Sequence, residues 1–132
     1  MITDPHGCIE WVNPAFTTMT DFSLHEAVGQ RPSKLLRSED TDIRTIRSID
    51  EKIANGEEFK IELVHRKKAG EAIWILIEAH PIYDGNGQLV NFVTLATDIT
   101  QRKADELALR KAKEEAETAN RAKSEFISRM SH

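Results

Sequence analysis

The last quarter of the chain differs sharply from the rest, and this difference limits the folds available to the sequence. After Thr100 no Gly or Pro occurs, and Ala, Glu, Lys and Arg dominate to the end of the 132 residues. Gly and Pro are the residues that most strongly interrupt helices, so this stretch favours one continuous helix. The preceding residues suffice for one small domain. The sequence therefore predicts a domain over residues 1–100 and a helix over residues 101–132.

The predicted helix contains a heptad repeat whose members recur at alternating spacings of three and four. The seam consists of Leu109, Ala112, Ala116, Ala119, Lys123, Phe126 and Met130. Alanine buries little apolar area, so we expect a parallel coiled-coil homodimer of low stability. The alternative is a solvated single helix stabilised by ion pairs such as Glu106–Arg110 and Glu117–Arg121.

Capping signals predict three helices in the domain. Asn13-Pro14 is typical of a helix start, and Ser23-x-x-Glu26 has the spacing of a capping box. A third helix has isoleucines on one face; we expect Asp40 or Thr41 to cap it and Asn55-Gly56 to end it. The isoleucines are Ile43, Ile46, Ile49 and Ile53.

Alternating and β-rich segments predict the strands, with Asp84-Gly85-Asn86-Gly87 as a hairpin turn. The first strand begins at Met1, and the others cover residues 8–12, 59–65, 72–82 and 89–96. This order of elements predicts an α+β fold with short helices on one face of an antiparallel sheet.

Charge and cysteine content narrow the function classes. Residues 101–132 contain eight Lys/Arg and six Asp/Glu, a net charge of +2; the other ten Lys/Arg and sixteen Asp/Glu give the domain a net charge of −6. An acidic domain does not suit nucleic-acid binding. The single cysteine, Cys8, fits a cytoplasmic protein. Because the first residues already resemble a strand, we expect a piece of a longer protein, with room for a membrane anchor upstream.

Several spaced motifs in residues 1–100 resemble those of PAS domains. They are Ile2-Thr3-Asp4-x-x-Gly7-x-Ile9 with Asn13-x-Ala15-Phe16, then Glu26-x-x-Gly29, Gly85-x-Gly87 and Asp98-Ile99-Thr100. The resemblance implies a sensory domain with a cavity between sheet and helices. It also implies that Asp98 and Thr100 relay a signal to the helix that follows.

The end of the chain resembles the first helix of a histidine-kinase dimerisation domain. The motif is Ala122-Lys123-Ser124-Glu125-Phe126-Ile127-Ser128-Arg129-Met130-Ser131-His132. In that family the histidine takes a phosphoryl group from ATP and passes it to a response regulator, which makes His132 the expected phosphoacceptor. No Gly-rich nucleotide loop occurs in the sequence. The ATP-binding kinase domain is therefore expected elsewhere in the parent protein, and this chain alone is expected to be inactive.

Within the PAS family the closest resemblance is to LOV-type and flavin redox-sensing domains, but the key LOV residues differ. Gly29 to Leu35 aligns with the LOV motif, and Pro32 occupies the position of its reactive cysteine. The two flavin-binding asparagines correspond to His65 and Ile75, and the signalling glutamine to Ala96. The resemblance thus implies a LOV-like domain without LOV photochemistry.

A noncovalently bound flavin remains an open possibility for the cofactor, with Phe59, His65 and Trp74 as candidate cavity residues. For Phe59 and Trp74 the alternative is ordinary core packing. Haem is not expected, because the helix from Asp42 to Asn55 has no histidine for an axial ligand. His25 and His80 are the alternative candidates for a haem ligand, but a lone histidine is more often a surface or hydrogen-bonded residue. No metal site is predicted.

The sequence therefore predicts the sensory input and relay module of a two-component histidine kinase. The module dimerises through its C-terminal helix and presents His132. Two alternatives stay open. One is a ligand-free PAS spacer that relays signals from another sensor, and the other is a flavin-binding redox or light sensor.

Overall fold

The computed structural model describes residues 1–131, so the predicted phosphoacceptor His132 lies outside the described residues. The chain forms two compact units, Met1–Ile99 and a second that begins at Thr100. No helix among the described residues is long and apolar enough to cross a bilayer.

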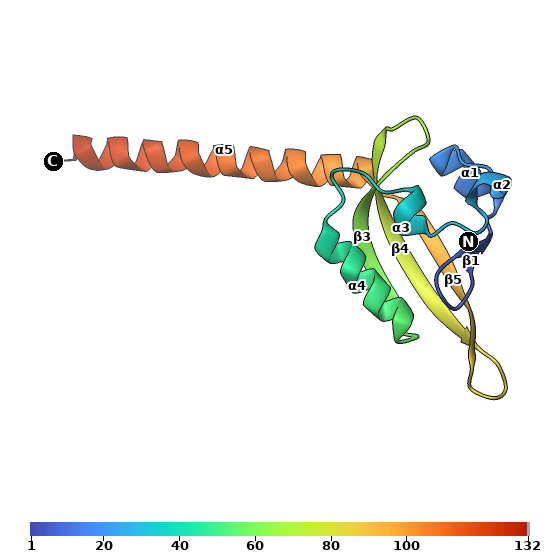
Figure 1. The fold of residues 1–132 in the computed structure, drawn as a ribbon. Helices are drawn as coiled ribbons and strands as arrows, with labels where there is room; N and C mark the ends of the chain where they lie inside the picture. The colour runs from blue at the N-terminus through green and yellow to red at the C-terminus, as the bar shows by residue number, and fades with distance from the viewer. Residues whose placement is uncertain (132) are drawn as a thin grey trace. The chain divides into compact units, whose positions relative to one another are not determined.

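The first unit is a five-stranded antiparallel sheet with four short helices, and the second is one helix (Figure 1). The strands are β1 (Ile2–Thr3), β2 (Ile9–Trp11), β3 (Phe59–Arg66), β4 (Ala72–Tyr83) and β5 (Leu89–Asp98). The helices are α1 (Pro14–Thr20), α2 (Leu24–Ala27), α3 (Pro32–Leu35), α4 (Ile43–Ala54) and α5 (Thr100–Met130). The spatial order of the strands is β2-β1-β5-β4-β3. The predicted α+β fold with a long C-terminal helix is confirmed.

The predicted caps of the first two helices are present. Asn13 accepts a hydrogen bond from the Phe16 amide at 3.0 Å. Ser23 and Glu26 each accept a hydrogen bond from the other's amide, both at 3.2 Å. These reciprocal contacts satisfy amides that the first helical turn leaves without partners.

Two local predictions need correction. The cap of α4 is Asp42, which accepts from the Arg44 amide at 2.9 Å. Thr41 does not cap the helix, because its hydroxyl donates to the Val64 carbonyl at 2.6 Å and so ties the start of α4 to β3. The short helix α3 was not predicted; it begins at Pro32 and has no side-chain cap at Arg31.

The buried side chains lie on one face of the sheet, the face that the helices cover (Figure 1). On β4 the residues Ile73, Ile75, Ile77 and Ala79 are buried and alternate with more exposed positions. Ile49 of α4 packs against this row. A second cluster forms around β2, α1 and α2 and contains Ile9, Val12, Phe16, Phe22, Ala27 and Leu36.

Gly56, at the end of α4, is expected to be sensitive to substitution. Its φ is +64°, and a Cβ there would lie 2.5 Å from the Tyr83 hydroxyl, which donates to the Gly56 carbonyl. Gly87 has a φ of +76°, and a Cβ added to it would have no atom within 4 Å, so Gly87→Ala isolates the backbone effect. We expect Gly87→Ala to cost about 1 kcal/mol and Gly56→Ala roughly 2 kcal/mol or more in urea unfolding. Equal losses would contradict the steric part of the argument.

Candidate ligand-binding cavity

The space between the sheet and the helices contains two adjoining chambers. The smaller, here the deep chamber, has a volume of about 50 Å³ and lies against α4 and the inner residues of β3 and β4. The larger, here the wide chamber, has a volume of about 270 Å³ and lies between α1 and strands β4 and β5. Both are lined by Met1, Pro32, His65, Ile77 and Thr94. The two chambers therefore share part of their walls, and together they are called the cavity.

His65 is the central polar residue of this cavity. It lies on the inner face of β3 and is 3% exposed. Its ring atom Nδ1 is buried and has no hydrogen-bond partner among the described residues. Burial lowers the pKa of His65 from 6.5 to about 4, because a buried imidazolium loses its hydration. His65 is therefore neutral at physiological pH.

The backbone on both sides of His65 is tied to the segment between α3 and α4. The Arg66 amide donates to the Leu36 carbonyl at 2.8 Å, and its guanidinium donates to the Arg37 carbonyl at 2.9 Å. On the other side, the Val64 carbonyl accepts from Thr41 at 2.6 Å. These contacts hold the backbone of β3 in place on both sides of His65, which lines both chambers.

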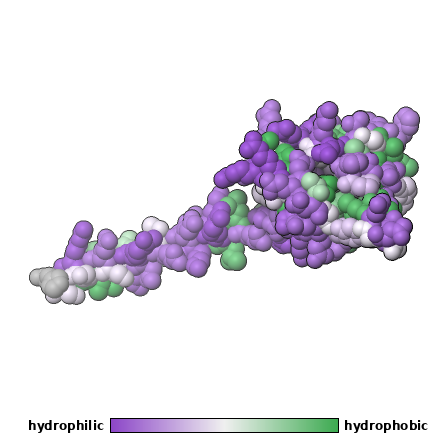
Figure 2. Space-filling view, turned by 60° about the horizontal axis from the view of Figure 1, so that its bottom comes forward, coloured by the Kyte–Doolittle hydropathy of each residue, from purple (hydrophilic) through white to green (hydrophobic). Residues whose placement is uncertain are grey.

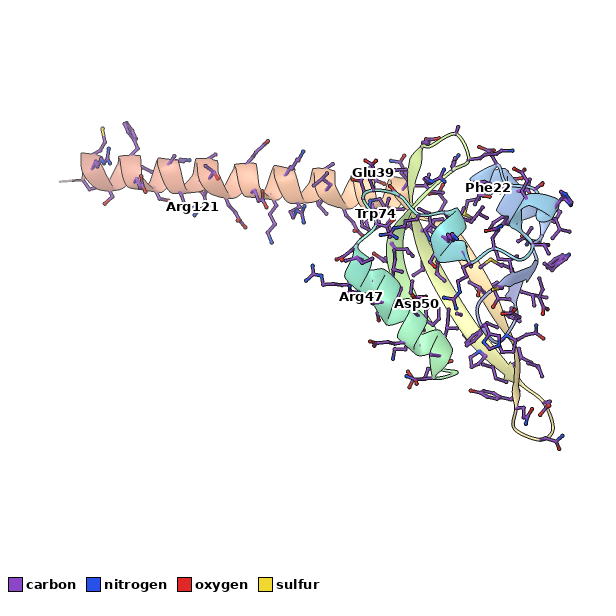
Figure 3. All side chains as sticks on the ribbon, viewed as in Figure 1. Phe22, Glu39, Arg47, Asp50, Trp74 and Arg121 are labelled. Atoms are coloured by element: carbon purple, nitrogen blue, oxygen red, sulfur yellow. The ribbon has the colours of Figure 1, made fainter. Side chains whose placement is uncertain are left out.

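An ion pair lies at the edge of the deep chamber. The Arg31 guanidinium is 3.6 Å from the Asp50 carboxylate and donates to the His6 carbonyl at 2.7 Å. Asp50 lies on α4 (Figure 3), Arg31 directly precedes α3, and His6 precedes β2, so the contacts join three segments. Because both side chains are about half exposed, the pair itself contributes little stability. Neither residue was predicted, since the partners are far apart in sequence.

Two of the three predicted cavity residues lie in the cavity. Phe59 and His65 line the deep chamber. Trp74 was placed wrongly: it is 36% exposed and lies on the opposite sheet face from Ile73 and Ile75. Successive strand residues point to opposite faces, so Trp74 cannot share a face with its buried neighbours.

The four positions at which the sequence departs from the LOV pattern come together in space. Pro32, His65, Ile75 and Ala96 all line the wide chamber. They come from α3 and from three adjacent strands. The wide chamber therefore brings together the positions at which the sequence was expected to differ from LOV domains. Thr94 and Thr3, both buried, add polar atoms to the deep chamber that the sequence had not indicated.

The strands that form the wall of the wide chamber lead directly to the C-terminal end of the domain. Ile75 pairs with Asp98, and Ile77 pairs with Ala96. The next residue, Ile99, is buried and its amide donates to the Trp74 carbonyl at 2.9 Å. Helix α5 begins at Thr100. The predicted relay residues Asp98 and Thr100 thus flank a buried residue that is bonded to β4.

The described residues contain no group of three or more His, Cys, Asp or Glu side chains that could hold a metal ion. His25 lies on the exposed side of α2, and His80 lies on β4 3.5 Å from Glu58. Neither histidine lines the two chambers.

Comparisons with known proteins identify the family. A PAS domain model matches residues 1–101. The blue-light-activated histidine kinase of Brucella canis is 34% identical over 103 residues, which are 76% of this chain and 21% of that protein. Phototropin-2 of Oryza sativa subsp. japonica is 30% identical over 99 residues, 75% of this chain and 11% of that protein. The chain thus spans about a fifth of the length of the Brucella relative.

Solved structures show the same fold. The light-state structure of the blue-light photoreceptor Aureochrome1 LOV has a TM-score of 0.71 at 26% identity, covering 84% of this chain and 88% of that chain. An RNA-binding light-oxygen-voltage receptor has a TM-score of 0.77 at 23% identity, covering 86% of this chain and 33% of that chain. With its five-stranded sheet, its cavity and a family model that spans the whole first unit, the chain belongs to the PAS domain family, close to LOV domains.

Proposed function

We propose that this chain is the sensory input and signal-relay module of a cytoplasmic two-component histidine kinase. The observation that carries the proposal is the continuity between the cavity wall and the start of α5. Ile75 lines the wide chamber and pairs with Asp98, which is two residues before Thr100. The similarity to histidine kinases supports the kinase context.

The relay follows from this continuity. A ligand or a chemical change in the wide chamber shifts the inner residues of β4 and β5, on which Ile75 and Ala96 lie. Paired strands move together, because their backbones share hydrogen bonds. The displacement reaches Asp98 and Ile99 and so changes the direction or rotation of the helix that begins at Thr100. A small shift is enough if the partner element has two packings of similar free energy.

The partner element in this proposal is a homodimer of α5. Figure 2 shows apolar side chains that interrupt the largely hydrophilic surface of this helix. Leu109 is 73% exposed and Phe126 is 63% exposed, so a single helix leaves its seam in water. Ion pairs such as Arg102–Glu106, at 3.5 Å, stabilise the single helix only weakly because they are exposed. A second copy of α5 gives the exposed seam a partner.

The output of the module is His132. A neutral imidazole is nucleophilic at physiological pH and can take the γ-phosphoryl group of ATP. The ATP-binding domain and the response regulator that receives the phosphoryl group belong to the parent protein and the pathway it serves. In this arrangement the module senses, dimerises and presents His132.

A pair of substitutions on one strand tests the relay in the longer protein that includes the ATP-binding domain. Ala96→Leu enlarges a side chain on the wall of the wide chamber, and we expect it to change autophosphorylation several-fold. Val93→Leu is the matched control, because Val93 lies on the same strand and is absent from the lining of both chambers. His132→Gln should remove the phosphoryl label from every variant. Labelling that persists in His132→Gln, or equal output from both leucine variants, would argue against the module.

Flavin is a second candidate for what the cavity senses, because the relatives are named for blue light. The residues present fit a flavin only in part. Its ring has a donor and several acceptors along one edge, and His65 is the residue here that can bond to that edge. Ile75 and Ala96 offer no hydrogen bond there, and Pro32 has no thiol. Purified protein that shows flavin absorbance would support a flavin; colourless protein that fails to bind added flavin mononucleotide would exclude it.

A further inference from the structure

The cavity wall contains a buried polar atom without a hydrogen-bond partner. Nδ1 of His65 is buried and has no partner among the residues that the structure describes, and the His65 residue lines both chambers. Leaving a buried polar atom without a partner is unfavourable, because the atom has given up its hydrogen bonds to water. A molecule that enters the cavity and bonds to this atom gains that free energy on binding.

The rest of the lining limits the charge of such a molecule. The wide chamber is lined mainly by apolar side chains, among them Phe16, Met19, Leu36, Ile75 and Ile77. The charged residues at the edge of the deep chamber, Arg31 and Asp50, are paired with each other. Apart from the Met1 ammonium, which already donates to the Thr94 carbonyl at 3.0 Å, the described lining of the wide chamber offers an ionised ligand no opposite charge to replace its lost hydration. The ligand is therefore neutral.

The volumes limit its size. The wide chamber, at about 270 Å³, exceeds the cavity of about 150 Å³ that holds a benzene molecule. It lies just below the range of about 300–1,000 Å³ that is typical of drug-sized ligands. A molecule with one or two rings fits this volume, and a flavin with its ribityl phosphate chain is larger than the chamber.

The chemistry of His65 selects the polar group. In a neutral imidazole, Nδ1 either donates or accepts, depending on which nitrogen holds the proton. A hydroxyl group both donates and accepts, so it satisfies Nδ1 in either tautomer. A single hydroxyl on an otherwise apolar ring therefore matches both the histidine and the walls.

We propose that the wide chamber binds a small, neutral, hydroxyl-bearing aromatic molecule of the phenol class, with its hydroxyl bonded to His65 Nδ1. The proposal rests on the proposed sensory function and names the class of molecule sensed. It also gives a role to the residues that differ from the LOV pattern. His65 provides the polar contact, while Ile75 and Ala96 provide apolar walls.

The test uses the full chain and two probes of nearly equal shape, p-cresol and p-xylene, which differ by a hydroxyl in place of a methyl group. Binding is measured by isothermal titration calorimetry. We expect p-cresol to bind wild type about tenfold more tightly than p-xylene, the ratio that one hydrogen bond typically provides. In His65→Leu this preference should disappear, while in the control His25→Gln it should persist, because His25 lies outside both chambers.

A second measurement does not depend on the folding of a variant. With ¹⁵N-labelled histidine, p-cresol should shift the Nδ1 resonance of His65 in wild type, and p-xylene should leave it near its free position. Equal affinity for the two probes, no binding of either, or tighter binding of flavin mononucleotide than of p-cresol would each overturn the proposal. Because these measurements do not involve His132, they can fail while the phosphorylation experiment succeeds, and the reverse.

Discussion

Lowering the pH from 7 to 4 is expected to destabilise the wild-type domain by about 3 kcal/mol more than the His65→Leu variant. The folded-state pKa of His65 is about 4, against an ordinary value of 6.5, because the ring is buried. One pKa unit corresponds to about 1.4 kcal/mol, which sets the size of the effect. The expected loss is a large fraction of the stability of a typical small domain.

The sign follows from the state that binds more protons. Well above pH 6.5 the histidine is neutral in both states, and its contribution to stability is constant. Between pH 6.5 and 4 the unfolded chain binds the proton while the folded domain does not, so stability falls as the pH falls. Glu26 and Asp42 have lowered pKa values, each with hydrogen bonds as the leading cause. The stability they contribute is lost as protons bind them at the acid end of this window and below.

Urea unfolding at a series of pH values measures the effect. His65→Leu removes the titrating group and the unpartnered Nδ1 together, so we expect its stability to change little between pH 6.5 and 5. The control His25→Gln removes an exposed histidine and should keep the wild-type slope. If His65→Leu loses stability as steeply as wild type, the buried histidine is not the source of the acid sensitivity.

The features that sequence predicted well are those determined by neighbouring residues. The Asn13 cap and the Ser23–Glu26 capping box involve partners only three residues apart, so spacing alone identifies them. The heptad spacing and the lack of Gly and Pro likewise predicted the long helix α5. Local hydrogen bonds and backbone preferences decide such elements, and tertiary packing changes them little.

The features that sequence could not predict depend on strand parity or on distant contacts. Residues 73–77 of β4 are all apolar, so their pattern does not show which face is buried. Trp74 was therefore assigned to the cavity, although it lies on the other face. The Arg31–Asp50 pair joins residues nineteen positions apart and has no local signal. Whether Nδ1 of His65 has a hydrogen-bond partner depends on all the residues that surround it in the fold, so the sequence alone could not predict it.

Replacing Ala112, Ala116 and Ala119 by leucine is expected to stabilise the proposed α5 dimer by about 10 kcal/mol. Each substitution adds about three carbon atoms to a seam position, and a buried methylene contributes roughly 0.8 kcal/mol. Two helices contribute three positions each. Analytical ultracentrifugation should show a monomer–dimer equilibrium in wild type and a dimer that persists on dilution in the triple variant.

The matched control places three leucines on the same helix, away from the seam and without its spacing of three and four, as Lys111→Leu, Glu117→Leu and Glu125→Leu. These residues lie between seam positions in the heptad and face outward from a dimer. The control chain adds the same number of leucines, so nonspecific hydrophobic association would affect it as strongly. Equal dimerisation of the two triple variants would contradict the predicted seam.

The same seam variant separates a relay from a passive spacer in the longer kinase. The alanine seam buries little area, so a modest change at Asp98 and Ile99 is sufficient to shift the wild-type helices between two packings. Leucines at the seam stabilise one packing of the helices by more free energy than a displacement of β5 can offset. Adding the seam leucines to Ala96→Leu should therefore abolish the several-fold change in phosphorylation that Ala96→Leu causes alone. A seam variant whose output still follows the cavity substitution would show that the signal does not pass through the packing of α5.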